Sequence, residues 1–296
     1  MDPRDVQPVE PITVSVRLLG RMSATVHGRD LHLSGRHAQA LLALLALRPR
    51  PRSREAIAAD LWPDGDPRCA GSLRQALWLL RGALGSVGVD PDAVIDANPD
   101  SIGFRPGIRV DLDASRFDRL VRVRPAQPEA ALLLYGGDLA EGLGYECFAT
   151  DRERLADAYE DALAMVAAGR LEAGDFDGAR SAAEQLLVRD ALREEAHEVL
   201  IRVFGSVGSR AQVVRQYRRL ESVLDAEIGV EPLPETIAAF RIALDETVER
   251  SRLRVAAGRR AGPRRADKPL REVPVSREPP PAFGEPRRLV ALAGRR

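Results

Sequence analysis

The sequence predicts a mainly helical protein in which a short region of mixed strands and helices precedes an all-helical repeat region. Three observations predict this fold class. Apolar residues alternate between residues 13 and 33, as in short strands. They then recur at three- and four-residue spacing from residue 36 to residue 84, as in amphipathic helices. Beyond residue 130 the pattern is helical almost throughout, and it repeats after 34 residues.

The first elements follow a leader, residues 1–11, which contains three prolines and is expected to be flexible. The alternation predicts strands over 13–19, 24–26 and 31–33. Gly28 lies between the last two strands, and glycine permits the tight turn that joins antiparallel strands. We therefore expect a small antiparallel sheet near the N-terminus.

Three helices are predicted after these strands. The first covers residues 36–48 and is closed by Pro49. The second begins after Ser53, whose hydroxyl is a good N-cap, and ends before residue 63. The third begins near residue 68 and ends at Gly85. Its apolar residues fall on one buried stripe: Leu73, Ala76, Leu77, Leu80 and Leu84.

A hairpin over 93–97 and 102–105 follows the third helix and is interpreted as a wing. Strands, three helices and a terminal hairpin are the order of a winged helix-turn-helix domain, here residues 12–110. We expect residues 111–129 to form a linker that contains the start of a short helix.

Glycines separate the helices of residues 130–250. Aligning Gly174 with Gly208 gives an offset of 34 residues and also pairs Leu186 with Leu220. This is the tetratricopeptide period, so we expect a tetratricopeptide-like domain of stacked helical hairpins. Three aromatic residues of these helices are expected in its core: Phe176, Phe204 and Tyr217.

The net charge of zero conceals three segments of different charge. Residues 1–124 carry 18 basic and 15 acidic side chains, a net charge of +3. Residues 125–250 carry 13 and 25, a net charge of −12, and residues 251–296 carry 13 and 4, a net charge of +9. An acidic middle segment is repelled by phosphates, so any nucleic-acid contact is expected from an end. The last segment is rich in Arg, Pro and Gly and is expected to be a disordered tail.

The sequence argues against several classes of protein. No apolar run is long enough to cross a membrane, and the N-terminus is unlike a signal peptide, so we expect a cytoplasmic protein. Nucleotide-binding, zinc-protease and serine-hydrolase motifs are absent, so we expect neither enzymatic activity nor a cofactor. Cys69 and Cys147 stand alone. His27, His32 and His37 have no acidic or thiol partner at metal-ligand spacing.

The outer face of the third helix supplies the candidate DNA contacts. A helix fits the major groove, where Arg can pair with guanine and Gln with adenine, so Arg74 and Gln75 are the base-reading candidates. Arg68 and Ser72, near the start of the helix, suit phosphate contact, as does Arg81 on its flank. The alternative is that Arg74 and Arg81 are solvated arginines on an amphipathic helix.

Further candidates lie beside these residues. Trp78 is expected to pack against the wing or a protein neighbour, and stacking on a sugar or base is the alternative. In the wing, the candidate contacts to the minor groove or the backbone are Asn98, Ser101 and Arg105, although Asp96 and Asp100 beside them have the wrong charge. The loop before the second helix holds an arginine set that suits phosphate, polymerase or solvent: Arg48, Arg50, Arg52 and Arg54.

These motifs, in this order, resemble the Streptomyces antibiotic regulatory proteins. In the N-terminal part the resemblance rests on DLW at 60–62 and on the third helix, which ends in LRGALG at 80–85. In the C-terminal part it rests on YRRL at 217–220 and EIGVEP at 227–232. It covers about residues 14–245. Trp78 and Gly82 depart from the polar or basic residues that are commoner in the third helix of that family.

The resemblance implies an OmpR-type DNA-binding domain followed by a bacterial transcriptional activator domain over 130–250. It further implies binding to double-stranded promoter DNA, often as a homodimer on direct repeats. It also implies recruitment of RNA polymerase subunits and activation of a secondary-metabolite gene cluster, with the protein located on the nucleoid. The competing hypothesis is a protein–protein interaction scaffold whose winged helix no longer binds DNA.

Overall fold

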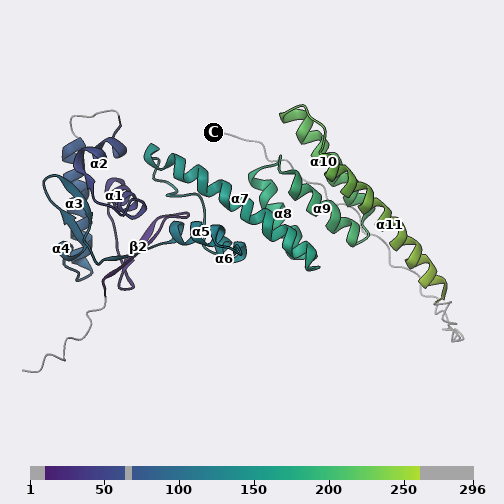
Figure 1. Cartoon of the computed structure of the whole chain (residues 1–296), viewed down its shortest axis with the longest axis horizontal. Coiled ribbons are helices and arrows are strands. Elements are labelled where there is room, and N and C mark those ends of the chain that lie inside the picture. The colour runs from purple at the N-terminus through teal and green to yellow at the C-terminus, as the bar shows by residue number, and fades with distance from the viewer. Residues whose placement is uncertain (1–10, 64–68, 261–296) are drawn as a thin grey trace, which may run out of the picture. The chain divides into compact units, whose positions relative to one another are not determined.

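The computed structural model of the 296-residue chain describes residues 11–63 and 69–260, with side chains described to residue 253. It confirms the predicted fold class, because a small region of strands and helices precedes a region built from helices alone (Figure 1). Residues 1–10 of the expected leader, Arg68, and the expected tail beyond residue 260 lie outside the described residues.

The first sheet has the strand order β3-β2-β1-β7. Its strands are β1 (Thr13–Arg17), β2 (Ser23–Val26), β3 (Arg29–Asp30) and β7 (Arg109–Leu112). The turn between β2 and β3 places both His27 and Gly28 at positive φ, which suits a two-residue hairpin. The prediction of a strand over 31–33 is wrong, because pairing begins directly after this turn and the chain leaves the sheet at Leu31, whose side chain is buried.

Three helices follow β3 in the chain and pack on one another, and the first of them contacts β7. They are α1 (Arg36–Leu47), α2 (Arg54–Leu61) and α3 (Cys69–Ser86). The second sheet has the order β4-β6-β5, with strands β4 (Arg52–Ser53), β5 (Ile95–Ala97) and β6 (Ser101–Phe104). The predicted hairpin is therefore present, but it is shorter than expected, since residues 91–94 form a one-turn helix, α4 (Pro91–Val94), capped by Asp90.

The segment expected to be a linker is packed into the protein. After β7 the chain continues directly into α5 (Asp113–Arg122), whose Phe117 is fully buried, and then into α6 (Pro128–Leu132). Asp113, also buried, accepts hydrogen bonds from the backbone N–H groups of Leu18, Leu19 and Ala114. Residues 109–124 contain five arginines, and this charge makes the apolar face of α5 difficult to recognise in the sequence.

Residues 136–141 lie beside the turn that follows β1. The Gly20 N–H donates to the Asp138 carbonyl at 3.1 Å, and the Ala140 N–H donates to the Leu18 carbonyl at 2.7 Å. A Cβ atom on Gly20 would lie 3.0 Å from the Gly136 carbonyl carbon, so glycine is needed for this approach. One hydrophobic core accordingly extends from β1 to Leu155.

The helical region contains α7 (Ala149–Glu172), α8 (Phe176–Arg189), α9 (Glu194–Ser206), α10 (Arg210–Glu227) and α11 (Pro234–Arg260), preceded by the 3-10 helix η1 (Glu146–Phe148). Gly174 and Gly208 both have φ of 77°. The residue after each donates to a carbonyl five positions earlier, Asp175 to Arg170 and Ser209 to Phe204. The two helix–glycine–helix turns are therefore equivalent at the predicted offset.

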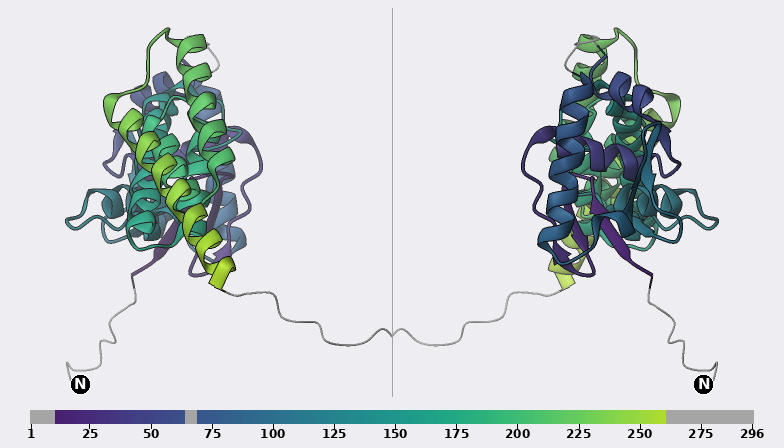
Figure 2. Two further views of the ribbon diagram at one scale, coloured as in Figure 1. Left: turned by 90° about the vertical axis from the view of Figure 1, so that its right-hand side faces the viewer. Right: turned by 90° about the vertical axis from the view of Figure 1, so that its left-hand side faces the viewer.

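Side chains between these helices form a second core. Leu186 and Leu220, aligned by the repeat, are both fully buried, and Phe204 is buried as expected. Tyr217 is half-buried because it stacks on Phe240 of α11 at a ring distance of 4.0 Å, and Figure 2 shows the two helices side by side.

Candidate nucleic-acid interface

Helix α3 is held by a buried apolar stripe. Leu73, Ala76, Leu77, Leu80 and Leu84 are all buried, in agreement with the 100° spacing of the sequence. Helices α1 and α3 pack on one another, and α1 is itself buried along most of its length. The position of α3 is thus fixed by core packing, which leaves its opposite face available.

The opposite face of α3 carries three of the predicted residues together. Arg74, Gln75 and Trp78 are exposed, and 71% of the surface of Trp78 is accessible. Residues three and four apart on a helix are neighbours, so the three side chains share one patch. Ser72, near the start of the helix, is half-buried. Trp78 is not packed against the wing as expected, since such packing would cover most of the indole.

Arg81, three residues after Trp78 on α3, and Arg105, directly after β6, converge on Asp92 of α4. Nη2 of Arg81 is 2.7 Å from Oδ1 of Asp92, and Nε of Arg105 donates to the Asp92 carbonyl oxygen at 2.6 Å. Arg105 also lies 4.0 Å from Asp96. The two arginines therefore tie α3 and β6 to α4, and part of their charge is already neutralised. The sequence signal for this arrangement was Asp90-Pro91-Asp92, a helix start that the sequence analysis missed.

The arginine set before α2 has mostly internal partners. Arg48 pairs with Asp151 at 2.6 Å, Arg52 pairs with Asp60, and Nε of Arg54 donates to the Asn98 carbonyl oxygen at 2.8 Å. Arg50 is exposed. Arg48 therefore links the end of α1 to residue 151, Arg52 links β4 to α2, and Arg54 links α2 to the hairpin turn.

The hairpin turn between β5 and β6 is closed by a local polar network. Oδ1 of Asn98 accepts from the backbone N–H groups of Asp100 and Ser101, at 2.9 and 2.8 Å. The Arg54 N–H donates to the Asp100 carbonyl oxygen, so the turn also contacts the start of α2. The expected wing is a short, internally bonded hairpin.

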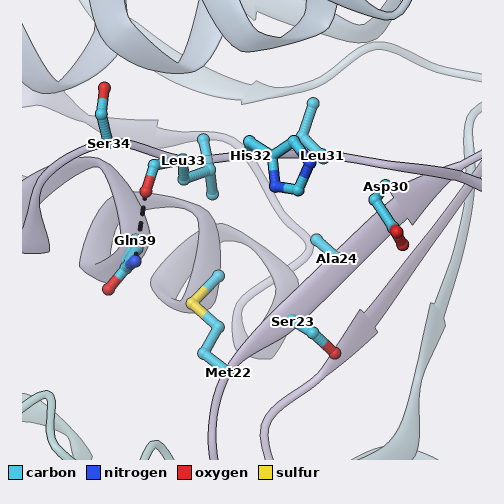
Figure 3. A pocket seen from close by; sticks show the side chains of 9 residues that line it. All are labelled: Met22, Ser23, Ala24, Asp30, Leu31, His32, Leu33, Ser34 and Gln39. Carbon is cyan, nitrogen blue, oxygen red and sulfur yellow. Dashed lines mark hydrogen bonds between the residues drawn. The ribbon is translucent and has the colours of Figure 1, made fainter.

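A separate pocket of about 520 Å³ lies between β2 and the start of α1 (Figure 3). The side chain of Gln39 crosses toward the preceding loop and donates to the Leu33 carbonyl oxygen at 3.2 Å. The lining residues are Met22, Ser23, Ala24, Asp30, Leu31, His32, Leu33, Ser34 and Gln39. None of the predicted DNA contacts lines it, so this pocket is separate from the candidate interface.

Three further features of the described residues concern metal sites, membrane spans and cysteines. No three His, Cys, Asp or Glu side chains among residues 11–63 and 69–260 lie close enough together to hold a metal ion. Over the same ranges, no helix has the length and apolar character needed to cross a membrane. Cys69 and Cys147 are both unpaired, and burial raises the pKa of the Cys147 thiol to about 11.

Residues 112–242 match the family model described as the bacterial transcriptional activator domain. Residues 112–242 are therefore similar to this domain, and we call this range the activator domain. The matched range includes α5 and the helices from α6 to α10, and it ends within α11.

Longer matches relate the chain to other proteins. Over 242 residues the chain is 27% identical to the transcriptional regulatory protein EmbR of Mycobacterium tuberculosis and to that of Mycobacterium bovis. These matches cover 73% of this chain and 60% of each relative. A solved structure of Mycobacterium tuberculosis EmbR in complex with a low affinity phosphopeptide has a similar fold, with a TM-score of 0.63 and 21% identity. That likeness covers 84% of this chain and 70% of the other.

Proposed function

We propose that this chain is a sequence-specific DNA-binding regulator of transcription that reads the major groove with α3. The observation that carries the proposal is the division of this helix into a buried leucine stripe and an exposed patch of Arg74, Gln75 and Trp78. The activator domain and the similarity to relatives named as transcriptional regulators support the same function class.

The predicted residues have different proposed roles. Arg74 pairs with guanine and Gln75 with adenine, because these side chains offer matching bidentate hydrogen bonds. Ser72 and Arg68 contact phosphates near the start of α3. Arg81 and Arg105 contact phosphates at the flank, and we expect each to contribute less than Arg74 because Asp92 already engages both.

The finer proposal concerns what the regulator does once bound. It acts as an activator on the promoter of a secondary-metabolite gene cluster, as the family resemblance implies. It binds there as a homodimer on direct repeats, and the activator domain recruits RNA polymerase subunits. The protein is then located in the cytoplasm, on the nucleoid.

The test is binding of the full chain to DNA fragments from upstream of the neighbouring genes, measured by gel shift at several salt concentrations. We expect binding that weakens steeply with salt and that falls at least about tenfold in Arg74→Ala. Glu172→Ala, an exposed change in α7, is the matched control and should bind as the wild type does. If the wild type binds no fragment even at low salt, the proposal fails and the scaffold alternative takes its place.

A further inference from the structure

We infer that Trp78 packs its indole ring against thymine methyl groups of the bound DNA, so that the chain selects A·T pairs opposite the middle of α3. This inference rests on the DNA-binding function proposed above and specifies what Trp78 recognises. It assigns to Trp78 a specificity-determining contact.

Packing among the described residues does not account for the exposure of Trp78. Among the described residues, Trp78 is the only Phe, Tyr or Trp whose side chain is exposed. The other tryptophan, Trp62, is half-buried and packs on His37 at a ring distance of 5.3 Å. An indole left in water forgoes a large burial area, and tryptophan is enriched where proteins bind their partners. Trp78 therefore indicates a contact that forms outside the chain.

The surroundings of Trp78 favour DNA as the partner. Arg74 and Gln75 lie one helical turn before it on the same face, and both are exposed. Residues 69–86 contain no Asp or Glu, so α3 itself places no negative charge beside the indole. One turn after it, a Cβ atom on Gly82 would meet nothing within 4 Å, so the indole projects from an open part of the helix. Arg74 and Gln75 suit the negative charge and polar groups of DNA, and the projecting indole of Trp78 suits apolar groups that DNA displays.

The chemistry of the major groove identifies the apolar group. The faces of paired bases are covered by their neighbours in the stack, so an indole on a groove-bound helix reaches base edges. Among those edges, the C5 methyl of thymine is the apolar group that distinguishes one base pair from another. Uracil pairs in the same way and keeps the same donors and acceptors, but it lacks this methyl group. Replacing thymidine by deoxyuridine therefore removes thymine methyl groups and leaves the hydrogen-bonding groups of every base pair in place.

The test is a double-substitution cycle on the full chain. A bound promoter fragment is prepared with thymidine and with deoxyuridine, and the affinity of wild type and Trp78→Ala for both duplexes is measured by fluorescence anisotropy. We expect the wild type to lose about fourfold in affinity for each contacted methyl group removed. Trp78→Ala should bind thymidine DNA about 30-fold more weakly, as for an aromatic hot spot, and should not distinguish the two duplexes. Single deoxyuridine substitutions then locate the contacted base.

The controls separate this inference from the proposed function. Val188→Ala removes another strongly exposed apolar side chain, on α8, and should keep the wild-type preference. If the wild type binds DNA but does not distinguish the duplexes, or if Trp78→Ala keeps the same preference, the inference is overturned while DNA binding stands. If Trp78→Ala binds both duplexes as tightly as the wild type, the indole faces a protein partner instead, and the inference again fails. If the wild type binds no DNA, the proposed function itself fails.

Discussion

Nη2 of Arg48 and Oδ2 of Asp151 lie 2.6 Å apart, although 103 residues separate them in the chain. Arg48 caps the end of α1, and Asp151 lies in the first turn of α7. The same two parts of the chain meet again where Nδ1 of His37 lies 2.6 Å from the Tyr145 hydroxyl oxygen. Helix α1 is thus held at both ends by residues of the activator domain.

The Arg48–Asp151 pair should contribute measurably but weakly to stability. A cycle of Arg48→Met, Asp151→Asn and the double variant, followed by urea unfolding, should give a coupling free energy of about 0.5–1 kcal/mol. The value is small because Arg48 is partly exposed and solvent screens the pair. If the losses in the free energy of unfolding of the two single variants add up to that of the double variant, the two residues do not interact in solution.

Replacing Asp113 should destabilise the protein strongly. Its carboxylate accepts three backbone N–H groups, those of Leu18, Leu19 and Ala114, and burial raises its pKa despite these bonds. Asp113→Ala leaves buried donors without an acceptor, so we expect a loss of about 3 kcal/mol in the free energy of unfolding. Asp113→Asn retains one acceptor oxygen and should lose less. Equal losses in the two variants, in urea melts, would contradict this account.

The two equivalent glycine turns should respond alike to alanine. Gly174→Ala and Gly208→Ala each place a Cβ atom at φ of 77°, which costs about 1–2 kcal/mol. Gly169→Ala is the matched control, because Gly169 lies inside α7 with open space around it, and alanine there should stabilise the helix by up to about 1 kcal/mol. If thermal melts show that Gly169→Ala is destabilised as well, the positive φ of the two turns does not explain the losses.

His197 should make stability depend on pH. It is buried between α9 and α10, where Nδ1 accepts from Gln216 and Nε2 donates to the Ala191 carbonyl oxygen. Burial lowers its pKa, and the nearby Arg219 acts in the same direction. The unfolded state therefore binds the proton more readily, so stability is retained above the ordinary histidine pKa of about 6.5 and falls as the pH drops below it.

The measurement for His197 is urea unfolding at about pH 7.5 and about pH 5.5. The wild type should lose more stability between these values than His197→Gln, which keeps polar atoms at the site but has no titrating ring. The same loss in both proteins would place the pH dependence elsewhere in the chain.

Local pattern was sufficient to predict most helices and the exposed face of α3. Apolar spacing alone separates Leu73 and Leu77 from Arg74 and Trp78, because a helix of 18 residues keeps its phase. The 34-residue repeat that aligns Gly174 with Gly208 can likewise be recognised from the sequence alone. These features depend on neighbours within a few residues, or on a repeat that the sequence displays directly.

The features that the sequence analysis missed depend on distant partners. Strand β7 pairs in parallel with β1, 96 residues earlier, and alternation over four residues carries little information about such a pairing. The engagement of Arg81 by Asp92 depends on how α4 folds back against α3. Helix α5 has four apolar residues, and only the distant core elements that cover Ala114 and Phe117 show that the segment expected to be a linker is packed.

The most direct test of the central claim compares affinity for an operator duplex with affinity for a scrambled duplex of equal length and charge. The account predicts that wild type prefers the operator and that Arg74→Ala lowers this preference about tenfold, because a base contact is lost, while its affinity for the scrambled duplex changes little. An unchanged preference in Arg74→Ala, or equal affinity of the wild type for both duplexes, would contradict a role for α3 in reading DNA sequence.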